Sequence, residues 1–180
     1  MTFGSLDLTR RNSHRWRTAV VGLVLASLIV GVAISLGGTM ARSLNPIGGL
    51  IWIASGVLLA MSLPPAQRPV PGVVVGAGAG FILGAFIRPA TLEAAIISFG
   101  IAGLLTVLVA GDRSGAWGFL VPSVYLPVHL IIGIGRAVMN GAPMRTDPPP
   151  TAMILPLMMI VAAAVGAAIA AALVQRQASR

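Results

Sequence analysis

The stretch Thr18–Leu36, TAVVGLVLASLIVGVAISL, contains no charged side chain. A helix needs about 20 consecutive apolar residues to cross the hydrocarbon core of a bilayer, and this stretch is close to that length. It is longer than the apolar segment of a secretory signal peptide, which has about 7–15 residues. No clean A-x-A cleavage site follows it. We therefore expect Thr18–Leu36 to remain in the chain as a first transmembrane helix.

Five further apolar runs follow, and the composition agrees with a membrane protein. Apolar residues make up 57% of the chain and charged residues only 9%, whereas a soluble domain carries about 25% charged residues. We predict an all-α, polytopic membrane helix bundle with about six transmembrane helices. The predicted spans cover residues 18–38, 47–63, 72–88, 92–110, 117–135 and 151–174.

The polar parts of the chain are short. We expect residues 1–17 to form a cytoplasmic Arg-rich N-terminal arm, residues 18–174 the six-helix transmembrane domain and residues 175–180 a cytoplasmic tail. Pro-containing connections, such as Asn45-Pro46, separate the spans. The third and sixth spans each follow a Pro-rich loop that contains an Arg. This similarity leaves open a 3+3 inverted repeat of the kind that many transporters have.

The basic residues predict the orientation of the bundle. All twelve are Arg, a composition typical of GC-rich bacterial genomes, so we expect a bacterial inner membrane. Cytoplasmic loops of membrane proteins carry an excess of Lys and Arg. With six spans, one side holds Arg10, Arg11, Arg15, Arg17, Arg68, Arg113, Arg176 and Arg180, and the other holds Arg42, Arg88, Arg136 and Arg145. Both termini are therefore predicted to be cytoplasmic. The net charge of +8 reflects this topology, and we expect no nucleic-acid partner.

The residues that bind metals or carry out covalent catalysis are scarce. Cys is absent, and the chain has only two His and four acidic residues. Thiolate metal sites and cysteine nucleophiles are therefore excluded, and transition metals usually require three or four protein ligands. We expect no cofactor and no enzymatic activity.

A ladder of glycines in the third span predicts close helix packing. Gly72, Gly76, Gly80 and Gly84 recur every four residues, and small residues at this spacing let another helix approach closely. The pattern leaves open whether the partner belongs to the same chain, to a second copy or to another membrane subunit. Besides the lipid bilayer, we therefore expect a homo-oligomer or other membrane subunits as partners. Further stripes of small residues are Ser27, Gly31 and Ser35; Gly56 and Ala60; and Ala162, Gly166 and Ala170.

The fifth span carries the most polar groups. Two prolines, Pro122 and Pro127, remove backbone donors and should free the carbonyls of Gly118 and Ser123, so we expect a kinked helix. The freed carbonyls should face protein or water rather than lipid. At 100° per residue, one arc of about 80° collects Gly118, Pro122, Tyr125, His129, Gly133 and Arg136.

His129 is the candidate polar site of this span. An ionisable side chain inside the membrane is typical of a functional site, and an imidazole titrates near neutral pH, as a proton relay requires. The alternative is a neutral imidazole that hydrogen-bonds Tyr125 or a freed carbonyl and only satisfies the kink.

Charged residues flank the third loop. Thr91 is predicted to cap a helix whose first turn contains Glu93, where a carboxylate is favoured by the helix dipole. The alternative is that Arg88, Glu93 and Arg136, which share one side of the membrane, form a vestibule that attracts anionic solutes. The segment Asp112–Gly115 is predicted to be a plain turn.

Two functions remain open. The first is a transporter or permease-like protein that moves a small solute, anionic if the charged vestibule exists. The second is a non-catalytic membrane subunit or assembly factor that docks on a larger complex. An intramembrane enzyme is disfavoured because Tyr125 is the only group offered to assist His129. No motif assigns the chain to a known family.

Overall fold

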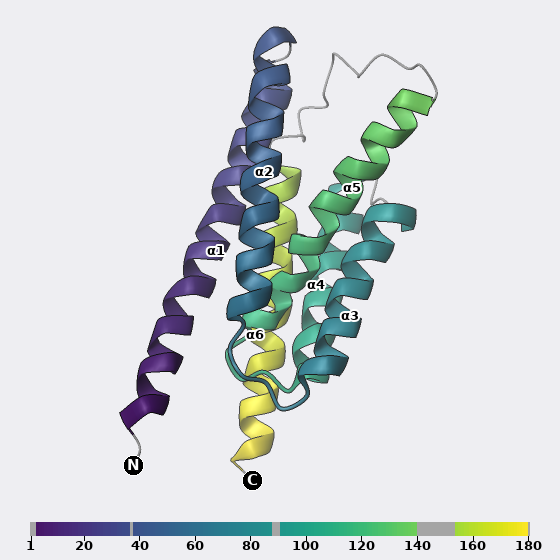
Figure 1. Cartoon of the computed structure of the whole chain (residues 1–180). Helices are drawn as coiled ribbons and strands as arrows, with labels where there is room; N and C mark the ends of the chain where they lie inside the picture. Colours follow the sequence, from purple (N-terminus) through teal and green to yellow (C-terminus); the bar gives the residue numbers. More distant parts are fainter. Residues whose placement is uncertain (1–2, 37, 88–90, 140–153, 180) are drawn as a thin grey trace.

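The computed structural model of the chain describes residues 3–36, 38–87, 91–139 and 154–179 (Figure 1), and within them every regular element is helical. Six helices are long and apolar enough to cross a membrane, which confirms the predicted all-α bundle of six spans and indicates a multi-pass membrane protein. The elements are α1 (Phe3–Leu36), α2 (Gly38–Ser62), α3 (Pro69–Ile82), the π-helix η1 (Leu83–Ile87), α4 (Leu92–Ala110), the 3₁₀-helix η2 (Ala116–Phe119), α5 (Leu120–Met139) and α6 (Leu155–Ala178).

The helices run up and down between two ends of the bundle. Both chain termini lie at one end, together with the connections α2–α3 and α4–η2, and we call this the terminal end (Figure 1). The opposite end is the distal end. Helix α1 packs along α2, and α4 packs along α6. Helix α5 contacts α2 and α3, and so it joins the α1–α2 hairpin to the rest of the molecule.

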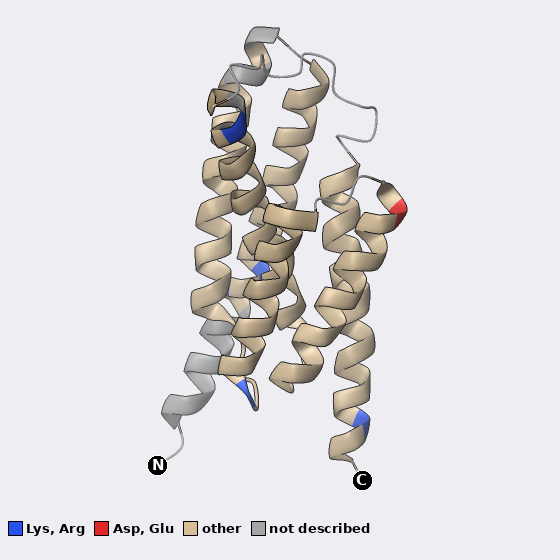
Figure 2. Ribbon diagram, turned by 90° about the vertical axis from the view of Figure 1, so that its right-hand side faces the viewer, with Lys and Arg blue, Asp and Glu red and all other residues tan. Residues whose placement is uncertain are grey.

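The side chains are distributed as lipid requires. Charged residues occupy few positions along the described ribbon (Figure 2). Large apolar side chains such as Leu50, Phe86 and Ile131 are exposed, at 68%, 74% and 66% of their surface. In water such a surface would mark an aggregation-prone or binding face, but on membrane-length helices it is the surface that contacts acyl chains.

The start of the second span differs from the prediction. Asn45-Pro46 was expected to lie in a connection, but α2 begins at Gly38 and Pro46 is inside it. Only one residue separates α1 from α2, so the two helices form a tight hairpin. Pro lacks the N–H that would bond the carbonyl four residues earlier. Pro46 is nevertheless accommodated in the first turn of the membrane-length segment Ser43–Ser62. The N-terminal arm is also helical, because α1 starts at Phe3.

The closest backbone contact in the bundle lies between α4 and α6. A Cβ atom on Gly103 would lie 2.5 Å from the carbonyl oxygen of Ala163, and a Cβ on Gly166 would overlap the carbonyl oxygen of Gly100. Small residues permit this approach because dispersion contacts and weak Cα–H···O bonds then form along the backbones.

The 3+3 inverted repeat is not shown by these pairings. In such a repeat α4 would pack on α5 as α1 packs on α2. Helix α4 instead packs chiefly on α6 and touches α5 little, whereas α1 packs along α2.

Candidate functional site

The polar stripe of the fifth span becomes more exposed toward the distal end. Gly118, Pro122 and Tyr125 are buried, His129 is partly buried, and Arg136 in the last turn of α5 is exposed. The stripe on α5 is thus enclosed by protein in the half nearer the terminal end and becomes exposed in the half nearer the distal end. Figure 1 shows α5 leaning away from α2 in the same direction.

Three aromatic rings pack together at the point where the burial changes. The Tyr125 ring meets the edge of Phe99 with centroids 4.9 Å apart and an interplanar angle of 86°. On its other side Tyr125 stacks with His129 at 5.3 Å and 19°. Tyr125 is only 5% exposed and Phe99 is fully buried. The role of Phe99 was not predictable from sequence, because an aromatic residue inside a uniformly apolar span gives no sign of which helix it will meet.

The two prolines of the fifth span have different roles. Pro122 was expected in the middle of a helix, but α5 begins at Leu120, so Pro122 lies in the first turn. There the missing N–H needs no partner. Pro127 is inside the helix and frees the carbonyl of Ser123. That carbonyl faces protein, since a Cβ on Gly56 of α2 would lie 3.3 Å from it.

The glycine ladder of α3 and η1 packs within the same chain. All four glycines are buried. A Cβ on Gly80 would lie 2.5 Å from the carbonyl oxygen of Val121, and one on Gly84 would lie 3.0 Å from that of Tyr125. Toward the terminal end, Gly72 and Gly76 have the side chains of α4 as their nearest neighbours. The glycine ladder therefore lets α3 and η1 pack directly against the backbone of α5 at Val121 and Tyr125.

A π-helix ends the ladder beside α5. The segment Leu83–Ile87 has π geometry and contacts α5. Its Gly84 lies next to Val128, one residue before His129, with a virtual Cβ 3.1 Å from the Val128 side chain. Single π turns within α-helices are rare and frequent at functional sites.

The structure does not assemble the predicted charged vestibule from the residues that it describes. Arg88 lies outside the described residues. Thr91 caps α4 by accepting a hydrogen bond from the Ala94 N–H at 3.2 Å, and Glu93 is exposed in the first turn. This geometry is that of an ordinary capped helix start. Glu93 and Arg136 both lie at the distal end, and within the described chain no ion pair joins them.

The turn at the terminal end is more elaborate than predicted. Asp112 is 1% exposed. Its Oδ1 accepts hydrogen bonds from the N–H and the hydroxyl of Ser114, both at 2.8 Å, and its Oδ2 accepts one from the Trp117 N–H at 3.1 Å. Gly111 and Gly115 on either side have φ of 65° and 76°, the left-handed region that Gly adopts without strain. An Asp two residues before a Ser is a recognisable Asx-turn pattern, so this feature was accessible to sequence analysis.

This turn fastens neighbouring elements together. The Trp117 indole N–H donates to the Pro64 carbonyl at 2.9 Å, and the Arg68 N–H donates to the Ala110 carbonyl at 2.8 Å. From α6, the Gln175 amide donates to the Arg113 carbonyl at 2.8 Å. The connections α2–α3 and α4–η2 and the end of α6 are therefore linked at the terminal end.

Comparison of the chain with protein-family models, with curated proteins and with solved structures found no match. Among the described residues, no three His, Asp or Glu side chains come close enough to hold a metal ion.

Proposed function

We propose that this protein is a small multi-pass permease whose solute path follows the distal half of α5 to the stacked pair Tyr125–His129. The observation that carries the proposal is the change in burial along α5. Along the polar stripe of this helix, Gly118, Pro122 and Tyr125 are buried, His129 and Gly133 are partly buried, and Arg136 is exposed. A path that is closed at one end and accessible at the other is the arrangement that alternating access requires.

The hydrogen-bonded terminal end supports a closed gate. Its ties join three separate parts of the chain, namely Trp117 to Pro64, Arg68 to Ala110 and Gln175 to Arg113. In this proposal the linked connections close the path on the cytoplasmic side, where the Arg distribution also puts both termini. In this proposal the membrane is a bacterial inner membrane, as expected from the all-Arg composition of the basic residues.

Two irregular helices lie where motion would be needed. Pro127 interrupts the backbone hydrogen bonds of α5, and the π-helix Leu83–Ile87 packs beside the same stretch. Broken or irregular helices are tolerated at membrane depth where they are buried in protein or line a cavity. We infer that α5 pivots at Pro127.

The proposed solute is small and anionic. Arg136 is exposed in the last turn of α5, at the entrance of the proposed path. Its guanidinium suits recognition of carboxylate or phosphate groups, and Arg88 is its proposed partner on the same side. No catalytic role is proposed for Tyr125 or His129, which would instead contact the solute as it passes.

A second candidate function is that of a non-catalytic subunit, and one face of α6 favours it. Ala168 and Ala172 are exposed, and Ala164 one turn earlier is partly buried. Small residues at this spacing are typical of helix–helix interfaces in membranes. In this case the stripe Tyr125–Arg136 would be packed and dry, and α6 would dock on a larger membrane complex.

Cysteine accessibility tests the permease proposal, because the chain has no native Cys. Single cysteines at Tyr125, His129, Gly133 and Arg136 would be treated in intact cells with a membrane-impermeant maleimide. A maleimide reacts with a thiolate, which forms only where water reaches the side chain. The permease proposal predicts labelling at positions 136, 133 and 129.

Two control cysteines make the result decisive. Ile131 is 66% exposed but lies about 200° around the helix from His129, so a cysteine there should face lipid and stay unlabelled. A cysteine at Gln177, exposed near the end of α6, should label only in inverted vesicles if the termini are cytoplasmic. Labelling at 136 alone would contradict the permease and favour the docking subunit.

A further inference from the structure

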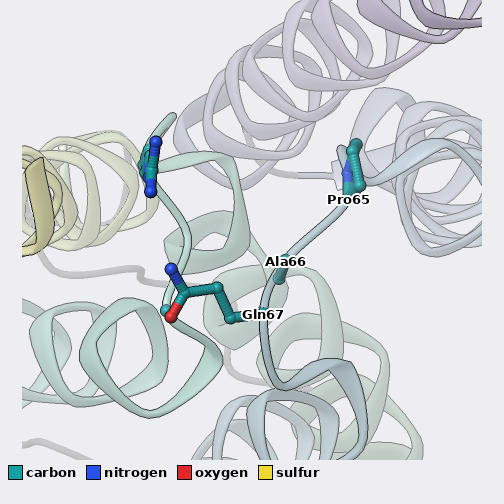
Figure 3. A pocket seen from close by; sticks show the side chains of 5 residues that line it. Pro65, Ala66 and Gln67 are labelled. Atoms are coloured by element: carbon teal, nitrogen blue, oxygen red, sulfur yellow. The ribbon is translucent and has the colours of Figure 1, made fainter. Parts of the chain in front are cut away.

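A hollow of about 290 Å³ lies at the terminal end, between the two linked connections (Figure 3). Pro65, Ala66 and Gln67 line it from the α2–α3 connection, and Gly111 and Arg113 line it from the α4–η2 connection. The Gln67 side chain extends from its own connection toward the neighbouring one, and its amide group is at the tip (Figure 3). Pockets for drug-sized ligands have about 300–1,000 Å³, so this hollow suits a single small polar group.

The walls of the hollow are held in place by the chain itself. The Arg68 N–H bonds the Ala110 carbonyl immediately beside it, and Trp117 bonds Pro64. Gly111 keeps its left-handed conformation with Gln67 packed against it, since a Cβ on Gly111 would lie 3.0 Å from the Gln67 Oε1 atom. A ligand that enters therefore meets backbone walls that are already in place, and only the exposed Arg113 and Gln67 side chains must order on binding.

The charge of the hollow selects an anion. Arg113 is exposed and lines the hollow, and the neighbouring Arg68 is exposed as well. The nearest carboxylate in sequence, Asp112, is buried with both oxygens engaged by Ser114 and Trp117. No acidic residue lines the hollow. A guanidinium offers five N–H donors in a planar fork that matches the oxygens of a phosphate.

The position of the hollow indicates where the phosphate comes from. The flanking spans end at Ser62, Pro69, Ala110 and Ala116, so the two connections lie where the hydrocarbon core gives way to headgroups. Trp117 lies on the same level, and Trp side chains are enriched at that interface. Anionic headgroups attract basic residues on the cytoplasmic leaflet.

We propose that this hollow binds the phosphate group of an anionic phospholipid, held by the Arg113 guanidinium and the Gln67 amide. The bound lipid would bridge the α2–α3 and α4–η2 connections and strengthen the terminal end. The proposal concerns a lipid site and is independent of whether the protein transports a solute.

Thermal unfolding of the full-length chain in neutral detergent, followed by Trp fluorescence, tests the site. Phosphatidylglycerol should raise the unfolding temperature with saturation, because a ligand that binds only the folded state stabilises it. Diacylglycerol with the same acyl chains lacks the phosphate and should give no saturable shift. Inorganic phosphate distinguishes a lipid site from a general anion site: an equal shift at equal concentration would overturn the lipid proposal.

Substitutions locate the effect. Arg113→Gln should raise the half-saturating concentration of phosphatidylglycerol by about tenfold, the loss expected for one charge-assisted hydrogen bond. The tie to Gln175 uses the backbone carbonyl of Arg113 and survives this change. Arg176→Gln, in the last turn of α6 and outside the hollow, is the matched control and should change the value by less than about twofold. Gln67→Ala should also raise the half-saturating concentration of phosphatidylglycerol.

Two outcomes would overturn the proposed lipid site. One is an equal effect of Arg113→Gln and Arg176→Gln, and the other is the absence of any shift with phosphatidylglycerol in the wild-type protein.

Discussion

Gly166 of α6 lies directly against the backbone carbonyl of Gly100 of α4, and the added methyl group of an alanine would overlap that oxygen. Backbone cannot rotate away as a long side chain can, so the two helices would have to separate. Overpacking of a core costs about 1–3 kcal/mol. We expect the loss of unfolding free energy in Gly166→Ala to lie near the upper end of this range. Equilibrium unfolding in mixed micelles with increasing SDS would measure the change.

Gly78 provides the control for this prediction. It lies on the same helix as the buried ladder, but a Cβ there would meet no atom within 4 Å. Gly78→Ala should therefore leave the unfolding free energy unchanged or raise it by up to about 1 kcal/mol, because Ala favours a helix interior over Gly. If both substitutions cost the same, the close approach of α4 and α6 is not what makes Gly166 necessary.

Two buried tryptophans differ in whether the indole N–H has a hydrogen-bond partner. Trp52 is 2% exposed, and its Nε1 has no hydrogen-bond partner among the residues that the structure describes, whereas Trp117 is 4% exposed and bonds Pro64. Substitution by Phe removes similar ring volume at both sites. Only Trp117→Phe also loses a hydrogen bond and leaves a carbonyl unsatisfied, while Trp52→Phe removes a buried donor for which the described part of the chain offers no acceptor. We expect Trp117→Phe to be the more destabilising by about 1–3 kcal/mol, measured by the same SDS titration. The reverse order would contradict the assignment of Trp117 as a tie of the terminal end.

Asp112 organises the turn that precedes α5. Its two oxygens accept three hydrogen bonds from Ser114 and Trp117. Asp112→Ala should cost about 2–4 kcal/mol, because hydrogen bonds to a charged group contribute about 1.5–3 kcal/mol and the buried Trp117 N–H loses its acceptor. Ser114→Ala removes two hydrogen bonds, the one that its hydroxyl donates to the Asp112 Oδ1 and the one that its Oγ accepts from the Ala116 N–H. It keeps both backbone bonds to the carboxylate and should cost about 1–2 kcal/mol. Thermal unfolding of both variants makes the comparison, and equal losses would show that the carboxylate does not hold the turn.

The spans were predictable from sequence because lipid imposes a minimum length on every apolar run. The partners of the small residues were not. Gly80, Gly84 and Gly166 each approach a backbone carbonyl, those of Val121, Tyr125 and Gly100. A carbonyl is present at every position of every helix, so the sequence contains no sign of which one will be met. The spacing of the glycines therefore predicts a close contact and leaves its partner open.

The candidate site was also only partly predictable from sequence, as the two prolines of α5 show. Whether a proline lies in the first turn or in the interior depends on where the helix begins, and that point is set by the Asp112 turn and η2 rather than by the proline. Reading the span as one uninterrupted helix therefore placed both prolines in its interior. The edge-to-face contact of Phe99 with Tyr125 was not predictable either, because it depends on how α4 is rotated against α5.

Pro127 is proposed to be the pivot of α5, and Pro127→Ala tests this directly. Alanine restores an N–H four residues after Ser123, whose carbonyl faces the backbone of α2 at Gly56. The straightened helix should gain about 1–3 kcal/mol in unfolding free energy, part of the cost of about 3 kcal/mol that an interior proline imposes. Pro122→Ala, in the first turn, relieves no such cost and serves as the matched control, since both changes loosen the unfolded chain alike. In a His129→Cys background, Pro127→Ala should also reduce maleimide labelling from the distal side, whereas Pro122→Ala should leave it unchanged. Increased stability with unaltered labelling would leave Pro127 as a tolerated kink and remove it from the proposed transport mechanism.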